Sequence, residues 1–211
     1  MRATTQLVFA ALFLTHLLQT LAAQDALDDW QLPNGEWYEA KEAILDPDNP
    51  RRLVGEPGNG VLINGPIGKT SSLVSRKQFQ DVQLHLEFMV AEGSNSGVSF
   101  HGNYEIQILD SAHVDKPTGA HCGGIYPRAE AEPTYHHIDA GSPPRVNAAR
   151  LPGQWQTLDI IFQSPRFDSS GNKISHAKFV RVVHNGLVIL EDVELAWANC
   201  ANWTRPQRGR G

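Results

Sequence analysis

The residues of this chain that are best suited to chemistry lie in one segment, Asn95–Asp110. The segment contains a histidine, His101, and a glutamate, Glu105, together with hydrogen-bonding side chains at Ser99 and Gln107. A carboxylate and an imidazole held close together can serve as general base and general acid, or can share a divalent metal ion. The segment is therefore the first candidate for an active site.

The pattern of apolar and polar residues predicts how this segment folds into a hairpin. A three-residue loop, Gly102–Tyr104, would place His101 opposite Glu105 and Ser99 opposite Gln107. This register gathers the apolar residues on one face, and a shift by one residue would expose them to water. Those apolar residues are Val98, Phe100, Ile106 and Ile108. Directly opposed Cβ atoms lie about 4.5–5.5 Å apart, so we expect the His101 imidazole and the Glu105 carboxylate to touch.

A solvated outer sheet face is the alternative interpretation of these polar residues, because antiparallel sheets often expose one face to water. None of the four is a lysine or an arginine, the flexible cations that are common on strands facing solvent. Short, directional side chains favour a catalytic or binding face. Asn95, at the start of the segment, is a further candidate for binding a substrate.

A larger β structure must carry this hairpin, because long helical periodicity is absent from the sequence. Strand-sized runs recur instead, and the clearest is Val82–Val90, in which apolar and polar residues alternate. Further strands are expected at Trp155–Phe162 and Ala177–His184, and Asn185-Gly186 after the second is a strong hairpin signal. The expected fold is all-β, a two-sheet antiparallel jelly-roll sandwich.

One long stretch, residues 111–151, does not have the pattern of strands and contains a single apolar island, Gly124–Tyr126. Loops of this length in a compact domain usually shape a site. Its His113 or His121 could complete the site if the stretch folds over the polar face. Trp155, which follows, could stack its flat ring on a ligand, and the alternative is a tryptophan buried between the sheets.

The composition excludes several classes of protein. The 211 residues are 41% hydrophobic and 19% charged, which indicates one folded domain and not an intrinsically disordered chain. The 23 acidic residues outnumber the 18 basic ones, and this excess argues against a nucleic-acid partner, since duplex binding needs a basic surface. Two cysteines, Cys122 and Cys200, are too few for a disulfide scaffold or a thiolate zinc site, and we expect both to be free.

The N-terminal segment has the pattern of a secretory signal peptide. Met1-Arg2 precedes an apolar, almost uncharged run that ends in small residues at Ala22-Ala23. We expect cleavage after residue 23 and export to a secreted or periplasmic location, with no stable membrane insertion afterwards. One domain is then expected over residues 28–195.

Six short motifs, in order along the chain, make it similar to a known family. They are Asn95–Val98, Tyr104–Asp110, Gly124–Tyr126, Pro152–Gln156, Pro165–Asp168 and His184–Gly186. The chain resembles the 3-keto-disaccharide hydrolase domain family, long known as a domain of unknown function that is abundant in secreted bacterial proteins. The resemblance implies a jelly roll like that of the concanavalin A-like lectins and glucanases. It also implies an oligosaccharide or glucoside substrate that is already oxidised at the 3-hydroxyl of the sugar.

A 3-keto sugar simplifies the chemistry, because the ketone acidifies the hydrogen on C2. A base can remove that hydrogen, the C1 substituent leaves by elimination, and addition of water gives net hydrolysis. Glu105 or His101 is the candidate base. The expected substrate-binding residues are Asn95, Ser99, Gln107 and Trp155. This route requires no cofactor, although a divalent metal bound by Glu105 and His101 would be another means of polarising the ketone.

Ordinary double-displacement glycoside hydrolysis is disfavoured, since it needs two carboxylates about 5–5.5 Å apart. The polar face continues from Glu105 to Gln107 and Leu109, neither of which can ionise. A non-catalytic, lectin-like sugar-binding module and an inactive, degenerate relative are the alternatives. The second alternative follows from residues 196–211, which depart from the closing strand of the family and are expected to form an irregular tail.

Overall fold

The computed structural model describes residues 29–31, 37–65, 68, 70–130 and 132–199. The predicted signal segment, Cys200 and the rest of the tail lie outside these ranges. The described residues form β structure with no α-helix. None of them belongs to a helix long and apolar enough to cross a membrane.

Four long antiparallel strands form the larger layer, in the order β16-β15-β12-β7. These strands are β7 (Val82–Phe88), β12 (Gln156–Gln163), β15 (Ala177–His184) and β16 (Leu187–Leu195). Buried and exposed residues alternate along β12, so one face of the sheet is turned to the core and the other to solvent. The strands predicted at Val82–Val90, Trp155–Phe162 and Ala177–His184 are confirmed by β7, β12 and β15, and β16 is the second strand of the predicted hairpin. Asn185 and Gly186, with φ of 49° and 81°, form the predicted turn between β15 and β16.

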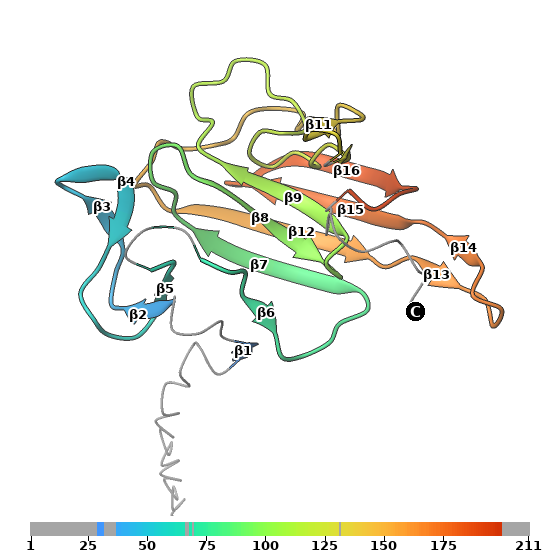
Figure 1. Ribbon diagram of the computed structural model, residues 1–211, viewed down its shortest axis with the longest axis horizontal. Helices are drawn as coiled ribbons and strands as arrows, with labels where there is room; N and C mark the ends of the chain where they lie inside the picture. Colours follow the sequence, from blue (N-terminus) through green and yellow to red (C-terminus); the bar gives the residue numbers. More distant parts are fainter. Residues whose placement is uncertain (1–28, 32–36, 66–67, 69, 131, 200–211) are drawn as a thin grey trace, which may run out of the picture.

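The second layer is built on the hairpin of β8 (Asn95–Phe100) and β9 (Tyr104–Leu109), which lies in front of β12 and β15 in Figure 1. The other edge of β9 is extended by the apolar island of the long stretch. Ile106 pairs with Ile125, and Ile125 in turn pairs with Ser142. Part of the segment predicted to be a loop therefore completes this sheet.

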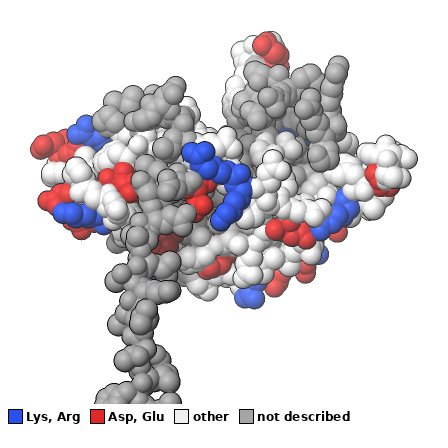
Figure 2. Space-filling view, turned by 90° about the horizontal axis from the view of Figure 1, so that it is seen from below, with Lys and Arg blue, Asp and Glu red and all other residues white. Residues whose placement is uncertain are grey.

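The remaining strands form five small two-stranded sheets around the two layers. They are β1 (Trp30–Gln31) with β6 (Val74–Ser75), β2 (Tyr38–Ala40) with β5 (Val61–Ile63), β3 (Ile44–Asp46) with β4 (Asn49–Val54), β10 (Ala129–Glu130) with β11 (His136–His137), and β13 (Arg166–Phe167) with β14 (Lys173–Ser175). On the face shown in Figure 2, the charged residues of both signs are interspersed. That face has no broad basic stripe among the described residues.

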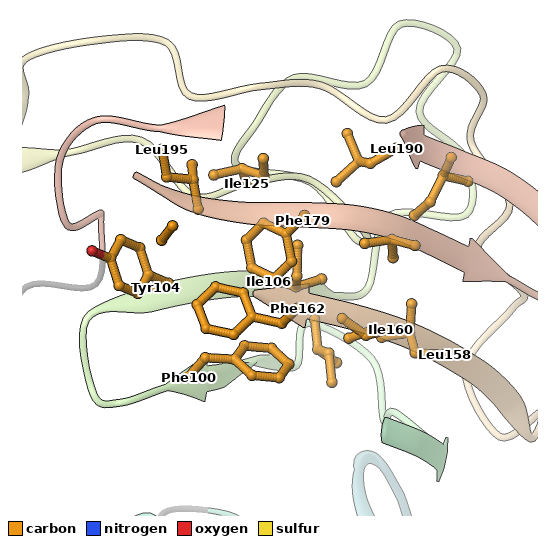
Figure 3. Close-up of a cluster of buried hydrophobic side chains, with 14 of the residues drawn as sticks. Phe100, Tyr104, Ile106, Ile125, Leu158, Ile160, Phe162, Phe179, Leu190 and Leu195 are labelled. Carbon is orange, nitrogen blue, oxygen red and sulfur yellow. The ribbon is translucent and has the colours of Figure 1, made fainter. Parts of the chain in front are cut away.

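The hydrophobic core lies between the two layers (Figure 3). Phe100 and Ile106 project into it from the hairpin, and Phe162 and Phe179 project from the larger sheet. The rings of Phe100 and Phe162 stack with centroids 4.8 Å apart, and Phe162 lies 5.2 Å from Phe179. The fold is an all-β, two-layer antiparallel sandwich, as the sequence predicted.

The register of the β8–β9 hairpin differs from the predicted one. Its three-residue loop is His101–Asn103, so Ser99 and not His101 is paired with Glu105. The loop closes through a hydrogen bond from the Asn103 N–H to the Phe100 carbonyl at 3.0 Å. The predicted opposition of His101 and Glu105 is therefore wrong.

Burial of Tyr104 explains the register that is formed. Tyr104 pairs with Phe100 on the core face, and its ring centroid lies 5.5 Å from that of Phe162. The predicted register would have left this large side chain in the loop. Because the two registers differ by two residues, each strand residue keeps the face that was predicted for it.

His101 is turned toward the larger sheet. Its backbone has a left-handed φ of 55°. Its Nε2 atom lies 2.7 Å from Ser164 Oγ and 3.1 Å from the Gln80 carbonyl, and its ring lies 5.9 Å from that of Phe162. The predicted pair with Glu105, whether as acid and base or as two metal ligands, rested on a direct opposition of the two residues that the observed register does not give.

The last described residues, 196–199, cross from β16 to the hairpin loop without forming a strand. Asn199 is buried, and its backbone N–H donates to the Asn103 carbonyl at 2.9 Å. This contact ties the end of the larger sheet to the second layer. The predicted lack of a closing strand beyond this point lies outside the described residues.

Candidate active site

The polar side chains of the second layer lie on the face directed away from the core. Tyr126 joins this face, because its neighbour Ile125 is buried in the core and its own N–H donates to the Glu105 carbonyl at 3.3 Å. We call the surface formed by Gly97, Ser99, Glu105, Gln107 and Tyr126 the Glu105 face. Three of the four polar residues first considered, Ser99, Glu105 and Gln107, are thus on one face, as predicted.

The Glu105 side chain lies over the backbone of Gly97. A Cβ atom at position 97 would lie 2.1 Å from Glu105 Oε1 and 2.8 Å from Glu105 Cδ. Gly97 is paired with Gln107, so Glu105 reaches its diagonal neighbour across the hairpin. The close approach, and not an unusual backbone conformation, accounts for the glycine here.

Asn199 fixes the backbone of Glu105. Its Oδ1 atom accepts a hydrogen bond from the Glu105 N–H at 3.0 Å. Its Nδ2 group donates to the Glu105 carbonyl at 3.0 Å and to the Tyr126 carbonyl at 2.9 Å. One side chain therefore bridges the two segments that carry Glu105 and Tyr126. Asn199 was not among the predicted site residues, since nothing in its local sequence pattern separates it from an irregular tail.

Gln107 is the buried member of the Glu105 face, with only 2% of its surface exposed. Its Nε2 group donates to Asn95 Oδ1 at 3.1 Å and to the Ala120 carbonyl at 3.4 Å. Its Oε1 atom is buried with no hydrogen-bond partner among the described residues. The predicted substrate-binding residues Asn95 and Gln107 thus lie together, but they hydrogen-bond to each other. The contact with Ala120 shows that part of the long stretch covers this end of the hairpin.

Two tyrosines and a histidine form a hydrogen-bonded cluster at the edge of the Glu105 face. The Tyr126 and Tyr135 hydroxyls lie 2.8 Å apart, and His137 Nε2 lies 3.2 Å from each of them. Burial, the hydrogen bond to Tyr135 and the charge of Glu105 together raise the pKa of Tyr126 to about 12. The Tyr126 hydroxyl therefore stays protonated at neutral pH. Tyr126 belongs to the apolar island visible in the sequence, but no sequence pattern indicates this cluster.

The other candidates lie elsewhere or engage local partners. His113 is exposed, and His121 Nδ1 accepts a hydrogen bond from the Thr118 N–H at 2.9 Å. Trp155 is 40% exposed, so it is not the buried tryptophan of the alternative interpretation. It lies at the opposite end of β12 from Phe162, about 23 Å away at the usual rise of a strand. Glu105 lies near the Phe162 end of β12, because its chain neighbour Tyr104 contacts Phe162.

No three histidine, cysteine, aspartate or glutamate side chains in the described part of the chain are arranged to hold a metal ion. Cys122 is free and buried in the core region. Burial raises the pKa of its thiol to about 11, which makes it a poor nucleophile at neutral pH.

Two hollows on the larger sheet are lined by other residues. One, of about 360 Å³, lies on the outer face of the sheet beside His85, Asp159 and Arg181. The other, of about 530 Å³, lies beside Ser164 and the β13–β14 hairpin. The hydrogen bond between His85 Nδ1 and Asp159 Oδ1, 2.6 Å long, raises the pKa of His85, but both side chains are largely exposed. Neither hollow includes a residue of the Glu105 face.

Comparison with known proteins identifies the family of this chain. Residues 20–210 match the 3-keto-alpha-glucoside-1,2-lyase-like domain. A search of curated proteins gave no match. Among solved structures, a protein of Parabacteroides distasonis named "putative glycosyl hydrolase" is similar, with 26% sequence identity and a TM-score of 0.50. The similarity covers 65% of this chain and 56% of that protein. The family match covers most of the sequence. The chain belongs to the family of 3-keto-alpha-glucoside-1,2-lyase-like domains.

Proposed function

We propose that this protein cleaves 3-keto-glucosides by elimination of the C1 substituent, with Glu105 as the base that removes the C2 proton. The observation that carries the proposal is the placement of Glu105. Its carboxylate is half-buried over Gly97, and its backbone is held on both sides by Asn199. Membership of the family supports the substrate class.

The neighbours of Glu105 favour elimination over double displacement. The other members of the Glu105 face are glycine, serine, glutamine and tyrosine, and none can act as a second carboxylate. A retaining glycosidase needs such a group about 5–5.5 Å away. Proton abstraction next to a ketone needs one base and one group that stabilises the enolate oxygen.

Ser99 and Asn95 are the polar residues best placed to bind the sugar. Ser99 is paired with Glu105, and both Ser99 and Asn95 are exposed. Their short side chains can hydrogen-bond sugar hydroxyls, while Gln107 orients Asn95 from below. His101 is left out of the proposed chemistry because it binds Ser164. The N-terminal segment predicts that the reaction takes place outside the cytoplasm.

The test uses 4-nitrophenyl 3-keto-α-glucoside and 3-keto-trehalose in D2O. The wild type should release the alcohol, form an unsaturated 3-keto sugar and exchange the C2 hydrogen for deuterium. Glu105→Gln should slow both processes by about 100-fold or more, as expected for loss of a general base. Ser96→Ala, a neighbouring change outside the Glu105 face, is the matched control.

Two outcomes would count against the proposal. Full activity of Glu105→Gln would remove Glu105 from the reaction. A folded wild type that binds 3-keto sugars in calorimetry, but neither releases the alcohol nor exchanges the C2 hydrogen, would identify a non-catalytic carbohydrate-binding module.

A further inference from the structure

We propose that Tyr126 is the general acid of this site and donates its proton to the oxygen atom that leaves C1. The inference rests on the proposed function, in which Glu105 takes the proton from C2. It assigns a role to a residue that lies outside the hairpin carrying Glu105, and a supporting role to Tyr135 and His137.

The pairing of the strands places Tyr126 beside Glu105. Ile106 pairs with Ile125, so Glu105 stands opposite Tyr126 in the adjoining segment, and their Cβ atoms are expected about 4.5–5.5 Å apart. Glu105 leans to the other side, over Gly97. The Tyr126 hydroxyl is directed to Tyr135 and His137, which lie outside the hairpin. The carboxylate and the phenol hydroxyl therefore diverge from neighbouring positions on one face.

This divergence suits an α-glucoside that approaches with its C1–C2 edge. In an α-glucoside the C2 hydrogen and the C1 oxygen lie on opposite faces of the ring, so the base and the acid must reach the sugar from opposite sides. Glu105 on one side and Tyr126 on the other meet this requirement. A base and an acid that leaned to the same side could not reach opposite faces of the ring.

The Tyr126 cluster can also restore the proton. The Tyr126 and Tyr135 hydroxyls lie 2.8 Å apart, and either can be the donor; when Tyr135 donates, the proton of Tyr126 is free to point toward the substrate. After the transfer, Tyr135 protonates Tyr126, and His137, 3.2 Å from Tyr135, protonates Tyr135. His137 is exposed and can take its proton from water. The high pKa of Tyr126 supports this role, because the hydroxyl remains protonated until an alkoxide forms.

The reaction balances without an oxidant or a reductant. The C2–H bond breaks and its proton moves to Glu105. The electron pair passes through the enolate and forms the C1=C2 double bond as the C1–O bond breaks. The leaving oxygen takes the proton of Tyr126. The products are an unsaturated 3-keto sugar and a free alcohol.

The experiment compares Tyr126→Phe with the wild type on substrates whose leaving groups differ in basicity. For methyl 3-keto-α-glucoside, whose alkoxide needs a proton, the variant should lose about 100-fold in kcat/KM. For the 4-nitrophenyl substrate, whose phenolate leaves unaided, the loss should stay below about 5-fold. Exchange of the C2 hydrogen in D2O should persist in the variant, because Glu105 is intact. Tyr38→Phe, on β2, is the matched control and should match the wild type on both substrates.

Tyr135→Phe provides a second variant, and Tyr135 would act as a positioning residue. It should show a smaller loss with the same dependence on the leaving group. An equal loss on both substrates, or a loss of C2 exchange together with cleavage in folded Tyr126→Phe, would overturn the role of Tyr126 and leave the proposed function intact. A wild type that neither exchanges nor cleaves would overturn both.

Discussion

The Glu105 side chain occupies the space that a side chain at Gly97 would need: a Cβ atom on residue 97 would lie 2.1 Å from Glu105 Oε1. The two residues are diagonal neighbours on the β8–β9 hairpin, and the absence of a side chain at one allows the other to lie flat on the sheet. The position of the proposed base is therefore determined by the strand that faces it.

The first prediction concerns Gly97→Ala. The added methyl group should push the Glu105 carboxylate out of its place, and a displacement of about 1 Å can cost about 100-fold in rate. Stability should change by less than about 1 kcal/mol, since the displaced atoms are the end of a flexible side chain. Steady-state kinetics and urea unfolding measure the two effects, with Ser96→Ala as the control. Unchanged kcat/KM in the folded variant would show that Gly97 does not set the position of the base.

A second prediction follows from the Asn199 bridge. Asn199→Ala would leave buried backbone groups of Glu105 and Tyr126 without partners, at a cost of about 2–4 kcal/mol in the free energy of unfolding. Asn199→Asp should cost more, because its carboxylate cannot donate and would face two carbonyl oxygens. Urea unfolding of the three proteins tests this order. A stable Asn199→Asp would mean that the bridge is not formed in solution.

The sequence predicted the face of Glu105 but not its neighbours, and the reason is physical. Alternation has a period of two residues, so it cannot distinguish hairpin registers that differ by two. The choice depends on whether Tyr104 enters the core beside Phe162, which is a tertiary contact. Asn199 lies 94 residues from Glu105 in sequence, and no local pattern can predict such a hydrogen bond.

The long strands were easier to predict because their signals are local. Ala177–His184 and the Asn185-Gly186 turn depend on local alternation and on local turn geometry. The apolar island around Ile125 was visible in the sequence. Its pairing with Ile106 was not, because the intervening loop conceals which strand it joins.

The third prediction separates anchoring from chemistry at His101. His101→Ala should lower the free energy of unfolding by about 1–2 kcal/mol, because it loses the hydrogen-bonding contacts with Ser164 and the Gln80 carbonyl. The turnover rate of the folded variant should remain within about 3-fold of the wild type. Ser164→Ala and the double variant complete a thermodynamic cycle, in which the two changes should be non-additive. If turnover instead fell by about 100-fold while stability stayed the same, His101 would return to the reaction.

The last prediction concerns pH and the core histidine His184, which is fully buried, with its Nε2 atom 3.0 Å from Gln156 Oε1. Burial, with a smaller effect of the Arg150 charge, lowers the pKa of His184 to about 4, below the ordinary value of 6.5. The unfolded chain therefore binds this proton more readily than the folded one, and stability should fall as the pH drops below 6.5 and level off below about 4. At pH 5 the expected loss is about 2 kcal/mol relative to neutral pH.

Urea unfolding at pH 7.5 and pH 5 measures this loss of stability in the wild type and in His184→Gln. The variant should lose less stability between these two pH values, whatever its stability at pH 7.5, because glutamine does not titrate. His85→Gln serves as the control of opposite sign, since the raised pKa of His85 stabilises the fold at low pH. An equal loss in wild type and His184→Gln would show that His184 is not buried in its neutral form.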